Sequence, residues 1–199
     1  MRRDLTEIVF ILDKSGSMAG KEGDVIGGYN AFLKTQLMEP GETMVTTVLF
    51  NDRYFVLYNG VAAEKAAMEP RDYLPEGTTA LLDAVGKTIL EVSSRITRTP
   101  EFLSPRKVIV VITTDGLENA SREFDKKQIK ELINRQRTMH DWSFIFLGAD
   151  IDAYAEASAI GINDKKDVYS YETHSVSYLE AMSCASNMVL TRRRKKTEK

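Results

Sequence analysis

The sequence has 199 residues, 43% of them hydrophobic and 28% charged, with a formal net charge of −2. This length suits one α/β domain, and the near-neutral balance predicts no broad attraction to nucleic acid or to an anionic membrane. The single cysteine, Cys184, excludes an internal disulfide. The early apolar run Ile8–Leu12 is too short for a signal-peptide core, and no stretch approaches the roughly 18 apolar residues that span a bilayer. We therefore expect a cytoplasmic protein, with export without a leader as the alternative.

The first third of the chain predicts a strand, a helix and a hairpin. The continuous apolar run 8–12 is typical of a strand that is covered on both faces. Apolar residues then recur at helical spacing over 25–33. Two further runs, 44–50 and 54–58, are separated only by Asn51-Asp52-Arg53, which is turn chemistry and predicts a β-hairpin. One antiparallel strand should therefore lie at the edge of the sheet.

The rest of the chain continues the alternation of helices and strands. Apolar stripes over 81–92 and 129–133 predict helices, and residues 173–191 predict a C-terminal helix. Between them, the runs 107–113 and 142–147 predict two more buried strands. This order predicts a doubly wound, Rossmann-like α/β fold: a mostly parallel sheet with one antiparallel edge strand and with helices on both faces.

We expect residues 1–191 to form one domain, because no repeat, linker or change in composition divides them. The basic run Arg192–Lys196 follows, and we interpret residues 192–199 as a solvated, disordered tail. Contact of this run with phosphate or with an acidic surface is the alternative. Folds of this class bind ligands beyond the carboxyl ends of their strands, so the loops at that edge are the place to look for function.

The first such loop is Asp13-Lys14-Ser15-Gly16-Ser17-Met18, directly after the first strand. A carboxylate and two hydroxyls stand at alternate positions, and glycine permits a tight turn between the serines. In a turning segment, alternate side chains can converge on one point. Neutral hydroxyl oxygens with a carboxylate suit a hard ion such as magnesium better than zinc, which prefers nitrogen and sulfur ligands.

Two later loops carry the same kinds of oxygen donor. Residues 75–81 contain Thr78 and Thr79 at the start of a predicted helix, and residues 113–119 place Asp115 at the end of a buried strand. An aspartate there is costly unless charge or hydrogen bonds satisfy it. Asp13 and Asp115 on one rim would also repel each other, and a cation between them removes the conflict.

These three loops together resemble the von Willebrand factor A superfamily. The first is similar to its Asp-x-Ser-x-Ser signature, Gly77–Ala84 looks like its central threonine segment, and Val110–Gly116 looks like its apolar strand ending in Thr-Asp-Gly. The three occur in the order of the family, and the likeness runs from about residue 5 to about residue 160. In particular, the chain resembles small stand-alone members from bacteria and phages.

The resemblance implies a metal-ion-dependent adhesion site. Ser15, Ser17 and Thr79 would supply hydroxyl ligands, with Asp13 and Asp115 acting largely through metal-bound water. Thr79 is chosen because Ala84 follows it by five residues, the family spacing of threonine and small residue; Thr78 is the alternative.

The resemblance also implies a function without catalysis. It predicts Mg²⁺ (or Mn²⁺) as the ion, and a partner protein whose exposed Asp or Glu replaces a metal-bound water. We expect a monomer that binds neither a specific nucleic acid nor a membrane.

Several alternatives stay open at this point. Ser15 and Ser17 could cap the helix that follows Gly20, and Thr79 could cap the next helix. We expect Glu118 and Asn119 to form a solvated loop, with an ordering or ligand-binding role as the alternative. As rival functions, a magnesium-dependent haloacid dehalogenase-like phosphatase would use Asp13 as its nucleophile, although Ser15 stands where its acid/base carboxylate should be. A scaffold with a vestigial metal site is the other rival.

Overall fold

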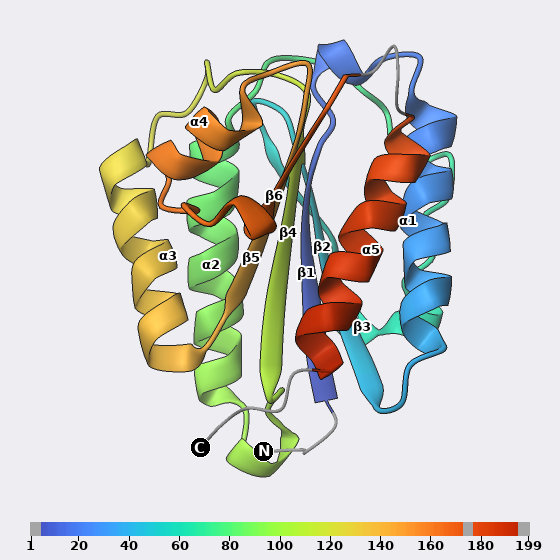
Figure 1. Cartoon of the computed structure of the whole chain (residues 1–199), viewed down its shortest axis with the longest axis vertical. Coiled ribbons are helices and arrows are strands. Elements are labelled where there is room, and N and C mark those ends of the chain that lie inside the picture. Colours follow the sequence, from blue (N-terminus) through green and yellow to red (C-terminus); the bar gives the residue numbers. More distant parts are fainter. Residues whose placement is uncertain (1–4, 173–176, 195–199) are drawn as a thin grey trace.

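A sheet of six strands runs through the molecule in the order β3-β2-β1-β4-β5-β6 (Figure 1). The computed structural model describes residues 5–172 and 177–194. β2 and β3 pair antiparallel, and the other neighbours pair parallel, which confirms the predicted sheet. The strands are β1 (Leu5–Asp13), β2 (Glu42–Phe50), β3 (Tyr54–Ala62), β4 (Lys107–Thr114), β5 (Ser143–Ala149) and β6 (Val168–Tyr171).

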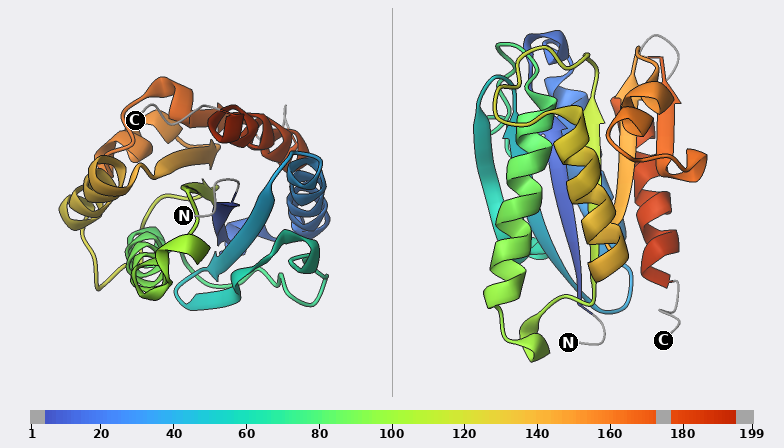
Figure 2. Two further views of the ribbon diagram at one scale, coloured as in Figure 1. Left: turned by 90° about the horizontal axis from the view of Figure 1, so that it is seen from below. Right: turned by 90° about the vertical axis from the view of Figure 1, so that its left-hand side faces the viewer.

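Helices cover both faces of this sheet, as the doubly wound prediction requires (Figure 2). One face packs against α1 and α5, and the other packs against α2, α3 and α4, so each face has its own hydrophobic core. The α-helices in the described residues are α1 (Glu22–Leu37), α2 (Leu81–Arg98), α3 (Lys126–His140), α4 (Ala153–Ala159) and α5 (Tyr178–Arg194).

The central position of β1 in the sheet explains the continuous apolar run 8–12 in its sequence. All nine of its residues are buried. Phe10 and Leu12 belong to the core under α1 and α5, whereas Val9 and Ile11 belong to the core under α2 and α3. Successive side chains of a strand point to opposite faces, so a strand covered on both faces has no position for an exposed polar residue.

The order in which strands are added to the sheet reverses at the boundary between the neighbouring strands β1 and β4. The strands β2 and β3 are added on one side of β1, and β4, β5 and β6 are added on the other. Leu12 pairs with Thr113, so the carboxyl ends of the two parallel strands lie level. Asp13 is the last residue of β1, and Asp115 directly follows β4. The two aspartates therefore flank the switch point at which open α/β sheets bind their ligands.

The end of α5 corrects the predicted start of the tail at residue 192. The helix continues through Arg194. The Arg192 guanidinium donates to the Asp167 carboxylate, Arg193 donates to a backbone carbonyl at the end of α1 at 2.8 Å, and Arg194 Nε donates to Glu39 at 2.9 Å. These cations are ordered because they meet acids and carbonyls of neighbouring elements at a helix C-terminus. Residues 195–199 of the predicted tail and 173–176 of the predicted helix lie outside the described residues.

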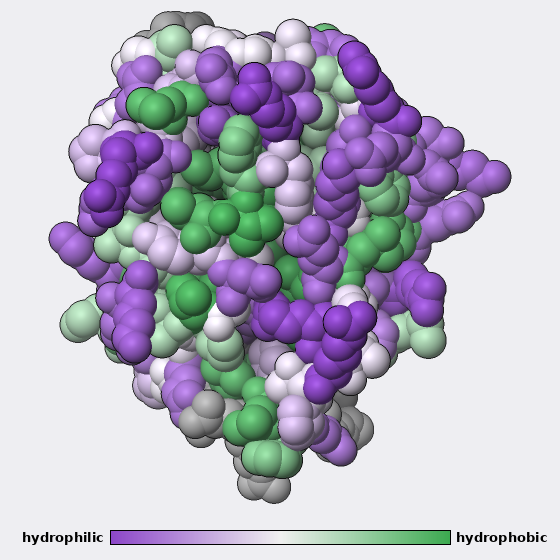
Figure 3. Space-filling view, turned by 180° about the vertical axis from the view of Figure 1, so that it is seen from behind, coloured by the Kyte–Doolittle hydropathy of each residue, from purple (hydrophilic) through white to green (hydrophobic). Residues whose placement is uncertain are grey.

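Edge strand β3 lies on the face shown in Figure 3, where apolar residues gather among hydrophilic ones. Val56 is 44% exposed, and Phe55, Leu57 and Tyr58 are half-buried. A positive φ of 62° at Gly60 and register shifts in the pairing with β2 make this edge irregular, which hinders pairing with a foreign strand. Among the described residues, no helix has the length and apolar character needed to cross a membrane.

Candidate metal site

Three loops meet at the carboxyl end of the sheet. The first follows β1, the second precedes α2 and the third follows β4. The Gly16 amide donates to the carbonyl of Gly77 at 3.0 Å, which joins the first loop to the second. The Asn119 amide donates to the carbonyl of Thr79 at 3.1 Å, which joins the third loop to the second. The backbone therefore fixes the three loops to one another.

Asp13 is fully buried beneath these loops and is hydrogen bonded through both carboxylate oxygens. Oδ1 accepts from the Ser15 amide at 2.7 Å, and Oδ2 accepts from the Thr114 hydroxyl at 2.6 Å. The Tyr73 hydroxyl donates to the Asp13 carbonyl. Burial raises the pKa of Asp13; hydrogen bonds from Ser15 and Thr114 oppose the shift, and the nearby charge of Asp115 adds to it. Asp13 is thus an oriented carboxylate with an environment that disfavours its own negative charge.

Ser15, Ser17 and Asp115 form a chain of oxygen atoms above Asp13. The two serine hydroxyl oxygens lie 3.1 Å apart, and the Ser17 hydroxyl donates to Asp115 Oδ1 at 2.5 Å. Ser15 is buried, Ser17 is exposed, and the Asp115 side chain is only 3% exposed. The cluster therefore opens to solvent on the Ser17 side. Neither serine caps α1, whose N-cap residue is Lys21.

Thr79, and not Thr78, faces this cluster. A Cβ atom added to Gly116 would lie 3.2 Å from Thr79 Oγ1 and 3.9 Å from Ser17 Oγ, so both oxygens surround one point. Thr79 is 4% exposed, and the N-cap residue of α2 is Ala80, so Thr79 does not cap that helix. The sequence-predicted residues Asp13, Ser15, Ser17, Thr79 and Asp115 are thus brought together by the three loops.

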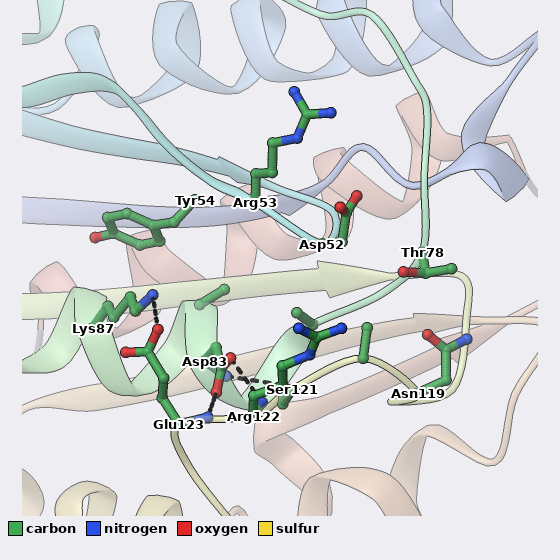
Figure 4. A pocket seen from close by; sticks show the side chains of 13 residues that line it. Asp52, Arg53, Tyr54, Thr78, Asp83, Lys87, Asn119, Ser121, Arg122 and Glu123 are labelled. Carbon is green, nitrogen blue, oxygen red and sulfur yellow. Dashed lines mark hydrogen bonds and ion pairs between the residues drawn. The ribbon is translucent and has the colours of Figure 1, made fainter.

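Thr78 instead lines a separate polar pocket of about 530 Å³ (Figure 4). Three charged side chains of this pocket have partners. Lys87 Nζ lies 2.7 Å from the Glu123 carboxylate, and the Asp83 carboxylate accepts three backbone N–H groups of residues 122–124 at 2.9 Å. The pocket is therefore a different environment from the hydroxyl cluster.

Glu118 and Asn119 order the third loop, and the expectation of a solvated loop is wrong. Glu118 accepts the backbone N–H of Leu82 at 2.9 Å and that of Ser121 at 2.7 Å, so it caps α2 from a distant segment. Asn119 Oδ1 accepts from the Thr79 amide at 3.0 Å. The acceptor is favourable at the Leu82 N–H because the first turn of a helix leaves its donors unpaired.

Lys21 is a member of the site that sequence reasoning missed. Its Nζ lies 2.6 Å from Asp115 Oδ2, across 94 residues of sequence. Thr114 and Tyr73, which bind Asp13, were missed as well. The position of Thr114 beside Asp115 was the only local signal for any of the three, since the other two contacts depend on loops brought together by the fold.

The donors of this cluster suit a hard divalent cation. Neighbouring ligand oxygens of an octahedral magnesium ion lie about 2.9 Å apart, given Mg–O distances of roughly 2.0–2.1 Å. The 3.1 Å between the Ser15 and Ser17 oxygens is close to that edge length. In residues 5–172 and 177–194, no three His, Cys, Asp or Glu side chains group as metal ligands. An ion bound here would therefore depend on the hydroxyls.

Solved von Willebrand factor A-type domains resemble the chain over nearly its whole length. The vWF domain of the type V pilus tip protein Mfa5 from Porphyromonas gingivalis is 10% identical, with a TM-score of 0.67 and 98% of each chain covered. Manganese-loaded TRAP from Plasmodium vivax is 16% identical, with a TM-score of 0.63 and with 95% of this chain and 75% of TRAP covered. The chain therefore has the von Willebrand factor A-type fold.

Proximal thread matrix protein 1 from the mussel byssus is also similar. It is 18% identical, with a TM-score of 0.66 and 95% of this chain covered, and the chain spans about half (46%) of its length. Another structure of that matrix protein has zinc in its MIDAS motif, the metal-ion-dependent adhesion site. No protein-family model matches the chain, and no curated protein sequence matches it.

Proposed function

We propose that the chain, up to the end of α5 at Arg194, acts as one domain that binds a divalent cation and, through it, an acidic group of a partner protein. The observation that supports this most directly is the meeting of Ser15, Ser17, Thr79 and Asp115 oxygens at the sheet switch point. Ligand sites of doubly wound folds lie at this position. The hydroxyl-rich donor set favours Mg²⁺ or Mn²⁺.

Each residue has a distinct role in this proposal. Ser15, Ser17 and Thr79 offer neutral hydroxyl ligands. Both Asp13 oxygens already accept hydrogen bonds, so Asp13 orients the Ser15 amide and the Thr114 hydroxyl and supplies charge from below. A bound divalent ion would supply a positive centre with an open coordination position for a carboxylate. Since neutral ligands cancel none of its charge, an anionic partner group is favoured there.

The same geometry argues against a phosphatase. A nucleophilic aspartate needs an oxygen that the substrate can reach, but Asp13 has no exposed surface. Its oxygens are engaged by Ser15 and Thr114, and the position of the acid/base carboxylate is a serine. We therefore propose a binding function without turnover. Magnesium-dependent hydrolysis of a phosphate ester that disappears in Asp13→Asn would overturn this view.

Calorimetric titration with Mg²⁺, Mn²⁺, Ca²⁺ and Zn²⁺ tests the metal site. Zinc belongs in the set because it occupies the MIDAS motif of the mussel matrix protein. We expect the double variant Ser15→Ala/Ser17→Ala to abolish binding and Thr79→Ala to weaken it at least tenfold. Thr78→Ala is the matched control, because Thr78 is exposed and faces the other pocket, and it should bind as the wild type does. Equal affinity in all these proteins would refute the ligand assignment.

A peptide library tests the acidic partner. Peptides with one exposed Glu should be captured in Mg²⁺ or Mn²⁺ and released by EDTA, and the same peptides with Gln should not be captured. If the wild type retains its partners in EDTA, and the double variant Ser15→Ala/Ser17→Ala retains them as well, the domain is a scaffold with a vestigial metal site and the proposed function is wrong.

A further inference from the structure

The Asp115 carboxylate is already paired with a cation from the protein itself. Lys21 Nζ lies 2.6 Å from Oδ2, and the Ser17 hydroxyl donates to Oδ1 at 2.5 Å. The Asp115 side chain is 3% exposed and the Lys21 side chain is 28% exposed. Both oxygens of the carboxylate are therefore engaged at the place where the proposed ion would need their charge.

Lys21 occupies a position that helix energetics does not favour for a lysine. It is the N-cap residue of α1, and its side chain makes no capping hydrogen bond. N-caps favour Ser, Thr, Asp and Asn, whose oxygens accept the free N–H groups of the first turn. A cation also opposes the positive end of the helix dipole. The favourable contact of this lysine is thus the one with Asp115 and not one with its own helix.

A second carboxylate lines the same cavity as this ammonium group. Lys21, Asp24 and Asp115 line one small cavity of about 80 Å³ together with Tyr171 and Tyr178. Asp24 is exposed and stands three residues after Lys21, a spacing at which side chains of a helix are neighbours. Within residues 5–172 and 177–194, the Asp24 side chain makes no hydrogen bond or ion pair. The ammonium can therefore exchange Asp115 for Asp24 without leaving the cavity.

We propose that Lys21 is a built-in counter-cation that occupies the metal site of the free protein and sets its affinity for divalent ions. This inference rests on the proposed function. In the metal-free protein Lys21 holds Asp115 in position and offsets its repulsion with Asp13. A divalent ion must compete with the ammonium for Asp115, and Asp24 receives the ammonium that is displaced. Lys21 consequently stabilises the free protein and weakens metal binding.

The test compares Lys21→Met with the wild type by two measurements. Thermal unfolding in EDTA reports on the free protein, and calorimetry with Mn²⁺ and Mg²⁺ reports on affinity. We expect Lys21→Met to unfold at a lower temperature in EDTA but to bind the ions at least tenfold more tightly, because two charges a few ångströms apart interact strongly near a protein surface. Lys34→Met is the matched control, since Lys34 is an exposed lysine in the last turn of the same helix. It should change neither property.

The Asp24→Asn variant probes the second half of the proposal. If Asp24 receives the displaced ammonium, this variant should bind ions more weakly than the wild type while its unfolding in EDTA is unchanged. If the wild type binds the ions and Lys21→Met binds them with equal or weaker affinity, the counter-cation role is overturned and the proposed function stays intact. Absence of binding in both proteins refutes the proposed function itself. Binding by Lys21→Met alone supports a site that the lysine keeps closed.

Discussion

Removal of one partner from a buried ion pair near the start of β1 should lower stability strongly and leave metal binding unchanged. Glu7 is fully buried, and its Oε1 accepts from the Arg95 guanidinium of α2 and from the Thr46 hydroxyl, the latter at 2.7 Å. Glu7 Oε2 has no partner among the described residues. A Cβ atom on Gly60 would lie 2.8 Å from the guanidinium, so the backbone of β3 packs closely against Arg95. Glu7 depends on Arg95 to offset its buried charge.

Arg95→Met would leave that carboxylate buried with a single hydroxyl donor. Removal of one partner of a buried pair costs about 3–5 kcal/mol. Arg95 is 27% exposed, so water can enter the space, and we expect the lower end, about 3 kcal/mol. In a protein of this size, that lowers the unfolding temperature by roughly 6–12 °C. The double variant Glu7→Met/Arg95→Met should regain most of the loss because it buries no charge.

Urea and thermal unfolding in EDTA measure these differences. Lys87→Met on the same helix is the control, because it removes a partly exposed pair with Glu123 and a distant contact with the Tyr54 ring, and it should cost about 1 kcal/mol or less. Metal affinity should be unchanged in Arg95→Met, since Glu7 lies about 20 Å along the strand from Asp13. A loss below about 1 kcal/mol, or a double variant less stable than the single one, would refute the reasoning.

Three further predictions concern the site and the C-terminal helix. Gly116→Ala places a methyl group 3.2 Å from Thr79 Oγ1 and should weaken divalent binding at least tenfold in calorimetry, with an unchanged circular dichroism spectrum. Asp13→Asn should raise the unfolding temperature in EDTA at neutral pH. Burial raises the pKa of Asp13 in the folded protein. The contribution of protonated Asp13 to folding stability is therefore present at low pH and is lost as pH rises through that raised pKa. Arg194→Ala should lower the unfolding temperature at pH 7 but not in acid. The hydrogen bond from Arg194 lowers the pKa of Glu39 in the folded protein. The stabilisation by this pair is therefore lost as pH falls through that lowered pKa.

Each of these predictions has an outcome that contradicts it. Wild-type metal affinity in Gly116→Ala would place the ion away from Thr79. An Asp13→Asn protein that is less stable than the wild type at pH 7, by an amount independent of pH, would mean that hydrogen bonding outweighs burial at this carboxylate. A deficit of Arg194→Ala that persists in acid would mean that its packing, and not its charge, anchors α5.

The sequence was sufficient to predict most of the sheet, because strands covered on both faces have an unmistakable apolar pattern. β1 and β4 are the clearest cases, and the hairpin of β2 and β3 followed from its turn residues. β6 was not predicted, since it has only four residues at the edge of the sheet and mixes exposed and buried positions. Such a strand is defined by its neighbour β5 and not by its own composition.

The site was predictable as far as its chemistry lies in local motifs. The three loops could be found because hydroxyls and carboxylates follow apolar strands, and the structure brings those residues together. Lys21, Glu118 and Arg192 could not be assigned, because each is held by a partner from another part of the chain. Lys21 meets Asp115 across 94 residues, and Glu118 meets the start of α2 across 36. A local run of charged residues predicts that these side chains are exposed to solvent, and it does not reveal partners that are distant in the sequence.

The preorganised loops finally predict how the protein should respond to metal. Backbone hydrogen bonds fix the three loops without an ion, so binding needs only to replace the ammonium of Lys21 and not to fold a segment. Stabilisation should then follow simple mass action, about 2.7 kcal/mol at a metal concentration 100 times the dissociation constant. Amide hydrogen exchange should slow only near Ser17 and Asp115, while the amides of Gly16 and Thr79 are already protected in EDTA. Broad protection of all three loops on metal addition would mean that the ion organises the site, and that the hydrogen bonds between the loops are too weak to do so alone.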